Sequence, residues 1–372
     1  MLEDVKEEFR DRIFSPVVTL AAFISQVLSE DRSCRKAVSR VDAERVAQGK
    51  DPCSPGTGGY CQARKRLSKD LIYQLLRETG DKLHGQSSPG WLWRGRRIVM
   101  ADGSTVSMPD TSENQAAFPQ PASQEPGLGF PLARLVVLIS YATGAVLDVA
   151  MGPNKGKKTG EHALLRQILG TLKSGDILIA DTVMESHASR KVDFRKGRRI
   201  GKRDHIVEWR KPSCPDWMDK NTYAAIPDKL VIRETRIGGK VLISTFLDPK
   251  KATRKELGDL YKIRWSVEIY LKFIKEIMKM DILRCRTPDM VRKEVGVHLL
   301  AYNMIRTIMA QAADRIGIIP RSISFKGATQ LLDSFADKIA HATGAIRIRL
   351  MEELSRTIAY HQIGNRPGRN RA

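Results

Sequence analysis

One stretch near residue 265 constrains this chain more than any other part of its sequence. Tyr261, Arg264, Glu268 and Lys275 follow one another at intervals of three, four and seven residues, which are helical repeat distances. On one helix, the four side chains would share a narrow face. Tyr, Arg and Lys grip phosphates, whereas a carboxylate among them would be repelled by DNA unless it held a cation. The stripe predicts metal-dependent chemistry on a nucleic-acid backbone, although a solvated face with an Arg264–Glu268 pair would look the same.

The charge balance favours a polyanionic partner. The chain has 372 residues, enough for two or three domains, and its 63 Lys and Arg against 42 Asp and Glu give a net charge of +21. That excess suits nucleic acid or an anionic membrane. We expect no membrane association, because we find no signal peptide, no apolar span and no basic amphipathic helix with an aromatic face. Five scattered cysteines without a Cys-x-x-Cys pair indicate reduced cytosolic thiols. We expect a cytoplasmic protein that is associated with the nucleoid.

The first part of the chain has helical spacing. Residues 17–28, 35–48 and 69–83 are predicted helices, and a loop rich in Pro and Gly at 51–59 precedes a basic segment at 62–66. We therefore predict a helical N-terminal DNA-binding domain at 1–90, although an ordinary helical domain would have the same pattern.

Strand patterns follow, and two of them end in an acid. Residues 98–102 form an apolar run that ends at Asp102, and residues 175–181 form a second that ends at Asp181. Between them, we predict a hairpin at 134–151 and an amphipathic helix at 160–172. The carboxyl ends of strands are where α/β folds usually place their chemistry.

A basic segment separates these strands from the stripe. Residues 190–211 contain ten Lys or Arg with Phe194 and Trp209 interleaved, and polar strands are predicted at 205–209, 230–235 and 240–246. Basic residues with aromatics can clamp a backbone and stack on bases, whereas the alternative is a solvated basic surface. The candidate DNA contacts in this run are Arg198, Arg199, Lys202, Arg203 and Trp209.

The remainder is predicted to be helical. We expect one long helix at 254–280, helices at 288–315, 322–340 and 345–358, and a basic tail from 364.

Three acids on separate elements form the candidate catalytic set. Two Mg²⁺ ions about 4 Å apart need several carboxylates that converge from different elements, and Asp102, Asp181 and Glu268 are predicted on two strands and a helix. Each acid alone is more often a turn or cap residue. The sequence has no competing Ser/His/Asp or Cys/His arrangement and no Gly-rich phosphate loop.

On these motifs, the chain resembles the DDE insertion-sequence transposases of the Tyr-Arg-Glu-Lys subgroup. The signature Tyr-x2-Arg-x3-Glu-x6-Lys is matched at 261–275, the first-acid motif at 101–110 and the second-acid context at 179–181, and the resemblance covers about residues 8–368. It implies an α/β (α+β) fold: an RNase H-like core at 91–189 and 251–345, a β-rich insertion at 190–250, and a C-terminal helix and tail at 346–372.

The resemblance also implies an activity and roles for residues. The activity is cut-and-paste transposition, with cleavage at terminal inverted repeats and transfer to target DNA by a homodimer in a synaptic complex. Asp102, Asp181 and Glu268 would be ligands of Mg²⁺, or of Mn²⁺. The residues that would position double-stranded DNA are Tyr261, Arg264 and Lys275, with Trp265 and Trp209 as base-stacking candidates.

One departure from the family concerns the segment after Asp181. A strand that runs parallel to the next needs a crossover of a dozen or more residues, usually a helix, and here the basic segment follows almost directly. We infer an internal deletion of about 20 residues on that crossover length, with a predicted strand at 178–187. Two alternatives stay open: a catalytically impaired DNA-binding remnant that competes for element ends, and another RNase H-like nuclease such as a junction resolvase.

Overall fold

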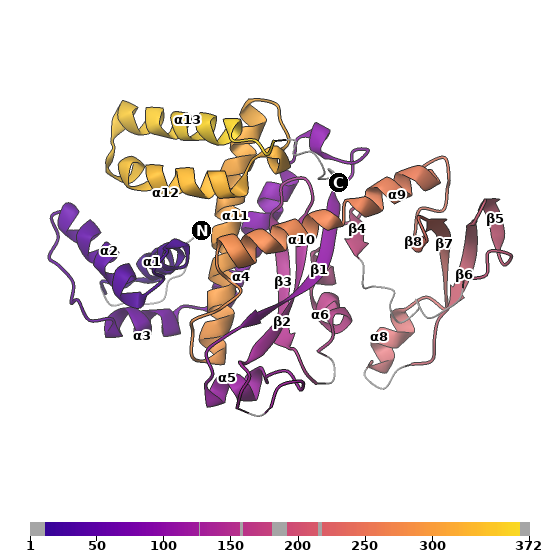
Figure 1. Ribbon diagram of the computed structural model, residues 1–372, viewed down its shortest axis with the longest axis horizontal. Coiled ribbons are helices and arrows are strands. Elements are labelled where there is room, and N and C mark those ends of the chain that lie inside the picture. The colour runs from indigo at the N-terminus through magenta and orange to yellow at the C-terminus, as the bar shows by residue number, and fades with distance from the viewer. Residues whose placement is uncertain (1–11, 126, 157–158, 181–191, 215–217, 365–372) are drawn as a thin grey trace. The chain divides into compact units, whose positions relative to one another are not determined.

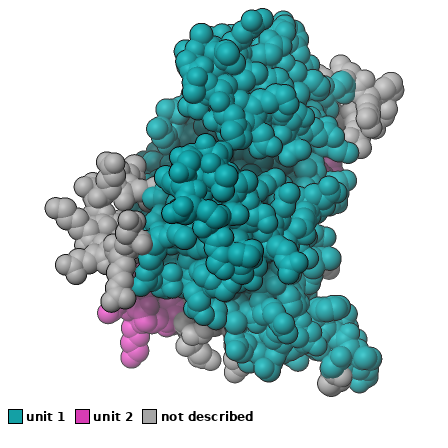
Figure 2. Space-filling view, turned by 90° about the vertical axis from the view of Figure 1, so that its left-hand side faces the viewer, with its two compact units in different colours: residues 1–178, 267–369 teal, residues 179–266, 370–372 magenta. Residues whose placement is uncertain are grey.

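The computed structural model describes residues 12–125, 127–156, 159–180, 192–214 and 218–364 (Figure 1). The chain forms two compact units, which Figure 2 colours separately. The first comprises residues 1–178 and 267–369, and the second comprises residues 179–266 and 370–372. We describe each unit by itself.

The first unit begins with four helices. They are α1 (Pro16–Leu28), α2 (Cys34–Ala47), α3 (Gly58–Arg66) and α4 (Lys69–Gly85). The serine before each of α1, α2 and α4 accepts a hydrogen bond from a backbone N–H of the first turn, which satisfies one of the free donors there. The three helices predicted from spacing are confirmed, and the basic segment at 62–66 lies in α3.

A four-stranded sheet forms the centre of the first unit. Its strands are β1 (Ile98–Ser107), β2 (Leu132–Ser140), β3 (Val146–Pro153) and β4 (Ile177–Ala180), in the order β3-β2-β1-β4. Strands β1 to β3 pair antiparallel, and α6 (Glu161–Ile168) leads from β3 to β4 while packing on β2 and β3. The predicted hairpin and helix are confirmed, as is the RNase H-like α/β class.

The position of Asp102 in β1 differs from the sequence expectation. Asp102 is not at the end of its strand, because β1 continues to Ser107 and stays paired with β2 from Val99 opposite Ser140 to Ser107 opposite Leu132. The following residue, Gly103, lies inside the strand and serves close packing. An added Cβ there would lie 2.3 Å from the Glu161 carboxylate oxygen on α6. Glycine therefore leaves room for the Glu161 side chain against β1.

Behind the sheet, α11 (Pro288–Arg315) runs through the core against α4. Asn303 on α11 is fully buried and binds both backbone groups of Val146 in β3. Its Oδ1 accepts from the Val146 N–H at 2.8 Å, and its Nδ2 donates to the Val146 carbonyl at 2.8 Å. One side chain thus satisfies a strand residue in place of a neighbouring strand. Even α11 is too polar to span a bilayer, and no other helix in the described residues is long and apolar enough.

Replacing Gly80 with alanine should destabilise this packing by about 2–4 kcal/mol, since overpacking a filled site displaces its neighbours. The new Cβ would lie 2.2 Å from the Val146 carbonyl oxygen, a backbone atom that cannot move aside cheaply. Urea unfolding measures the effect. Gly85→Ala in the same helix is the control, because nothing lies within 4 Å of that Cβ and alanine there should be neutral or stabilising. Equal midpoints for the two variants would contradict the packing argument.

The segment predicted as one helix over 254–280 is instead three helical pieces. These are α9 (Arg254–Lys262), α10 (Trp265–Lys272) and a π-helix (Phe273–Ile277). The expectation of one helix was wrong because the chain tightens between α9 and α10, where the N–H groups of Arg264 and Ser266 bond three residues back. Two later helices, α12 (Phe325–His341) and α13 (Gly344–Tyr360), confirm the predictions there. Shorter helices are α5 (Ser112–Ala117) and 3₁₀ turns at Pro89–Trp91, Leu169–Thr171 and Pro320–Ser322.

The second unit contains its own antiparallel sheet in the order β5-β6-β7-β8. Its elements are β5 (Arg198–Gly201), β6 (Asp204–Arg210), β7 (Lys229–Ile237) and β8 (Lys240–Ser244), with α8 (Lys220–Ala225) between β6 and β7. The three strands predicted here are confirmed. The additional strand β5 lies inside the basic run, where its sequence Arg-Arg-Ile-Gly shows no alternation of polar and apolar residues.

Acid should weaken the first unit through His84. Its Nδ1 lies 2.7 Å from the Ser140 hydroxyl, and burial, with a smaller effect of the Arg97 guanidinium, lowers the pKa of His84 to about 4. The unfolded chain therefore binds a proton more readily between pH 6.5 and 4, so stability falls as pH falls through that window. We expect a loss of about 2 kcal/mol at pH 5 relative to pH 8. Urea midpoints of wild type and His84→Gln at both pH values measure it, and an equal loss in the variant would exclude His84 as the cause.

Candidate active site and nucleic-acid interface

Of the two predicted aspartates, the structure describes Asp102 but not Asp181. Asp102 lies half-exposed in the middle of β1, opposite Val137, and its Oδ1 accepts a hydrogen bond from the Gly103 N–H at 2.8 Å. Asp181 and the predicted strand at 178–187 beyond Ala180 lie outside the described residues. The described strand β4 ends at Ala180, so Asp181 directly follows the strand next to β1.

Glu268 and Lys275 belong to consecutive helical pieces of the first unit. Glu268 is exposed in the first turn of α10, and Lys275 is half-buried in the π-helix. A π-turn adds residues to a helical turn and is frequent at functional sites. It also changes the angular spacing on which a seven-residue repeat depends, so a common face for all four signature side chains stays a prediction.

The chain just after Lys275 is joined to the strand that carries Asp102. Ser107, the last residue of β1, donates its N–H to the Asp281 carbonyl at 3.0 Å and accepts from the Leu283 N–H at 2.9 Å. The Ser107–Ile282 bridge is parallel. Residues 281–283 thus pair with the end of β1, on the side of β1 that does not face β2. Sequence reasoning missed this connection, because three residues are too few to show a strand pattern.

A cluster of rings and cations surrounds Tyr261 in the second unit. The Lys240 ammonium lies 5.6 Å and the Arg264 guanidinium 5.9 Å from the centre of the Tyr261 ring. Arg264 also lies 5.2 Å from the Trp265 ring. Arg264 is only 5% exposed, whereas Trp265 is 54% exposed. The guanidinium therefore supports both rings, and Trp265 presents the open surface. Lys240 was not predicted, because a lone Lys after a Gly-Gly turn carries no distinctive signal.

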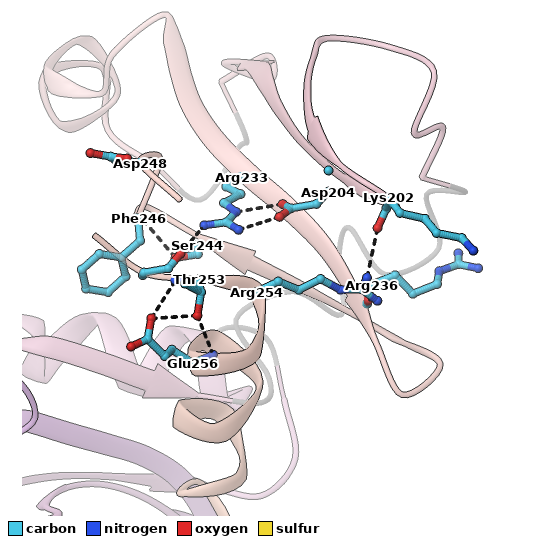
Figure 3. Close-up of polar contacts among 12 residues, drawn as sticks. Lys202, Asp204, Arg233, Arg236, Ser244, Phe246, Asp248, Thr253, Arg254 and Glu256 are labelled. Atoms are coloured by element: carbon cyan, nitrogen blue, oxygen red, sulfur yellow. Dashed lines mark hydrogen bonds and ion pairs between the residues drawn. The ribbon is translucent and has the colours of Figure 1, made fainter. Parts of the chain in front are cut away.

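The basic run of the second unit presents its charges to solvent. Arg198, Arg199, Lys202 and Arg203 are all exposed. The basic residues lie on and beside the hairpin of β5 and β6. Arg254 on α9 donates to the carbonyl of Lys202 in the turn of this hairpin and to the carbonyl of Arg236 on β7 (Figure 3). The arrangement holds cationic side chains on a fixed β-hairpin, which suits contact with a phosphate backbone.

Beneath that surface lies a buried polar network. His205 Nδ1 contacts the Lys196 carbonyl at 2.6 Å, and its Nε2 lies 2.8 Å from the Glu234 carboxylate. Because a carbonyl only accepts, Nδ1 is the donor in the contact with Lys196. The Trp209 indole N–H donates to the other Glu234 oxygen at 2.9 Å. Trp209 is half-buried and held by Glu234, so its base-stacking role stays a prediction.

A second buried pair lies on the neighbouring residues of the same strands. Arg233 donates to both carboxylate oxygens of Asp204, at 2.8 and 2.5 Å, and to the Ala252 carbonyl at 2.6 Å (Figure 3). Both side chains are at most 5% exposed. The pair ties β6 and β7 to the chain that enters α9, whose first turn is closed by a capping box of Thr253 and Glu256.

The donor types at the candidate metal site fit a hard cation. Asp102 and Glu268 offer only carboxylate oxygens, which are the ligands that Mg²⁺ prefers. Within the described residues, no three His, Cys, Asp or Glu side chains lie close enough to hold a metal ion. The third predicted ligand, Asp181, lies outside those residues.

The comparison with protein families decides the identity. Residues 93–304 match the model described as the transposase DDE domain, which is more than half of the chain. The chain belongs to the DDE transposase family. The matched residues include all four strands of the first sheet and all of the second unit's sheet. The DDE domain thus spans both units, and it contains Asp102, Asp181 and Glu268.

Named relatives of this DDE transposase domain come from insertion sequences of Escherichia coli. The transposase InsG for insertion sequence element IS4, from strain K12, is 28% identical over 288 residues, or 71% of this chain and 64% of the relative. The transposase for insertion sequence element IS421 is 26% identical over 106 residues, or 24% of this chain and 29% of the relative. The chain thus spans less than two thirds of either relative.

A solved structure of another transposase also aligns with the chain. It is the piggyBac transposase synaptic complex with hairpin DNA, at 9% identity and a TM-score of 0.37, covering 99% of this chain and 81% of that one. A score this low supports no argument about the DDE domain described above.

Proposed function

We propose that this chain is an insertion-sequence transposase that binds terminal inverted repeats and performs metal-dependent cleavage and strand transfer. The observation that carries the proposal is the DDE transposase match at 93–304, because a single domain contains all three predicted acids. The names of the relatives and the net charge of +21 support the same conclusion.

The roles that we propose for the residues follow from their chemistry. Asp102, Asp181 and Glu268 would hold Mg²⁺ or Mn²⁺ through carboxylate oxygens. When bound, the metal would activate the attacking water or hydroxyl and stabilise the leaving oxygen. Lys275 would pair with a phosphate near the reacting bond. Tyr261, supported by Arg264 and Lys240, and Trp265, which is exposed, would contact the strand that is cut.

The DNA partner would contact both units. The exposed basic residues 198, 199, 202 and 203 would bind the backbone of double-stranded DNA, and the N-terminal helices would contribute to recognition of the ends. We further propose the division into a domain at 1–90, a core at 91–189 and 251–345, an insertion at 190–250 and a C-terminal segment at 346–372. A homodimer would pair two element ends in the cytoplasm, on the nucleoid.

We also propose that the chain is of the Tyr-Arg-Glu-Lys subgroup and lacks a crossover segment after Asp181. Two features support the deletion. Only residues 181–197 separate β4 from β5, and the first sheet has four strands within the described residues, with no further strand beyond β4. A connection of that length leaves little room for a crossover helix and the strand that it would serve.

Cleavage of a labelled duplex that carries the element's own terminal repeats tests the function. We expect nicking at the repeat end with Mg²⁺ or Mn²⁺ and none with a chelator, since the acids act only through the metal. A duplex with scrambled repeats is the matched control. Binding of the repeats without nicking would identify a DNA-binding remnant, and equal cleavage of scrambled repeats or of a four-way junction would favour another RNase H-like nuclease.

A further inference from the structure

An unusual buried arginine lies beside the helical pieces that carry Glu268 and Lys275. Arg306 on α11 is 1% exposed, and its Nη2 has no hydrogen-bond partner among the described residues. Four aromatic rings surround its guanidinium carbon: Tyr270 at 4.7 Å, Phe325 at 5.0 Å, Tyr302 at 5.1 Å and Phe273 at 5.5 Å. We call these four rings the Arg306 cage.

The buried Arg306 guanidinium is a charge that other groups in the core must compensate. An arginine side chain stays charged in proteins, and taking a charge out of water is costly unless other groups compensate it. Here the compensation comes from ring faces, and from one hydrogen bond that the Arg306 Nε donates to the Tyr302 hydroxyl at 2.8 Å. The stability of this core therefore depends on the rings keeping their places around the guanidinium.

Two rings of the cage come from the segment between the signature residues. Tyr270 lies in α10, two residues after Glu268, and Phe273 begins the π-helix, two residues before Lys275. The Tyr270 hydroxyl also donates to the Tyr141 carbonyl at 3.4 Å, and the Phe273 ring stacks on Phe325 of α12 at 5.1 Å. The cage thus fixes the turn between Glu268 and Lys275 to α11 and α12.

The turn between β2 and β3 closes the cage on another side. Gly144 has a φ of +73°, and an added Cβ would lie 2.8 Å from the Arg306 guanidinium carbon. Glycine is needed there both for the left-handed turn and for the close approach. The guanidinium therefore lies where the sheet hairpin, α11 and the π-helix meet, all within the first unit.

The geometry points to Arg306 as a positioning residue for DNA cleavage: its cage sets the location of Glu268 and Lys275 without touching DNA or metal. This inference rests on the proposed function. Because a displacement of about 1 Å at a reacting centre can cost about 100-fold in rate, loosening the cage should slow cleavage while DNA binding by other surfaces persists.

Hydrogen exchange and cleavage by the full chain test the inference. In Arg306→Met, which matches the stem but removes the cation, we expect exchange over residues 265–277 to rise about tenfold or more, as lost cation–π contacts imply. Single-turnover cleavage of the repeat duplex should fall about 100-fold, with the Kd for that duplex within about twofold of wild type, since these residues lie in the core. Arg306→Lys keeps the charge, so its exchange and cleavage rates should lie between those of wild type and Arg306→Met.

The matched control is Arg292→Met. Arg292 lies on the same helix and makes the same kind of contact, over the Phe118 ring at 4.9 Å, which is no ring of 265–277. It should leave exchange in that segment and cleavage unchanged. Unchanged exchange over 265–277 in the Arg306 variants, or an equal effect of Arg292→Met, would overturn the inference. If Arg306→Met does not fold, Arg306→Lys decides by the same criteria. A wild-type chain that never cleaves would refute the proposed function, while exchange would still test the cage.

Discussion

Replacing Glu268 with alanine should abolish metal-dependent cleavage at the repeat ends while repeat binding remains. Metal stabilisation of a phosphoryl-transfer transition state is worth several kcal/mol, and each 1.4 kcal/mol or so is a factor of ten, so we expect a loss of about 1,000-fold or more. Binding should persist because Glu268 is exposed at the surface and contributes no positive charge. Single-turnover cleavage and a filter-binding titration with the same duplex measure the two effects.

A nearby acid provides the control for that experiment. Glu276 is an exposed carboxylate in the π-helix, eight residues after Glu268, and it pairs with Lys272 at 3.6 Å. Glu276→Ala should cleave like wild type, since an exposed pair of this kind contributes little. A third single variant, Asp181→Ala, tests whether Asp181 is a metal ligand. A loss as large as that of Glu268→Ala would mean that Asp181 still reaches the metal despite the inferred deletion, whereas full activity without Asp181 would contradict its role as a ligand.

Replacing Arg233 with methionine should destabilise the second unit by about 3–5 kcal/mol, because it leaves the Asp204 carboxylate buried without its partner. Arg233 makes three hydrogen bonds from a fully buried position, two to Asp204 and one to the Ala252 carbonyl. Losing these bonds should loosen β6 and β7, and with them the exposed basic residues of the β5–β6 hairpin. Hydrogen exchange over residues 204–244 should therefore accelerate strongly, and repeat binding should weaken with it.

Two further variants separate the buried charge from simple loss of contacts. The double variant Arg233→Met, Asp204→Leu removes both charges and should recover most of the stability, since apolar replacement of a buried pair is often neutral. Arg195→Met breaks an exposed pair with Asp193, where Arg195 is 91% exposed, and should leave the stability close to that of wild type. A double variant as unstable as the single one would show that the hydrogen bond to Ala252, and not the unpaired charge, carries the effect.

The elements that sequence patterns predicted well are those with a long, undisturbed period. The helices at 16–28, 69–85 and 288–315 and the hairpin of β2 and β3 all have strong apolar repeats, and the structure confirms them. Confirmation of these helices and strands does not confirm the candidate metal site, however. The convergence of the three acids is untested, since Asp181 lies outside the described residues.

What the patterns could not predict depends on contacts between distant residues. From sequence alone, a glycine after an acid, such as Gly103, suggests a turn. The structure instead places the Glu161 carboxylate where a Cβ of residue 103 would lie. The break at 263–264 and the π-helix leave no mark on a seven-residue repeat, because they arise from local bonding and from rings packed around Arg306. Tertiary packing overrides local propensity at such points, and here they lie beside the signature residues.

The bridge between Ser107 and residues 281–283 closes a loop of the chain 174 residues long. The entropy of closing such a loop grows only with the logarithm of its length, so a doubling costs about 0.6 kcal/mol. By the same relation, removing about 20 residues from within it changes closure by only about 0.1 kcal/mol. Chain entropy is thus nearly indifferent to how much sequence lies between the first acid and the glutamate. The sheet edge can therefore form at nearly the same entropic cost with or without a crossover segment after Asp181.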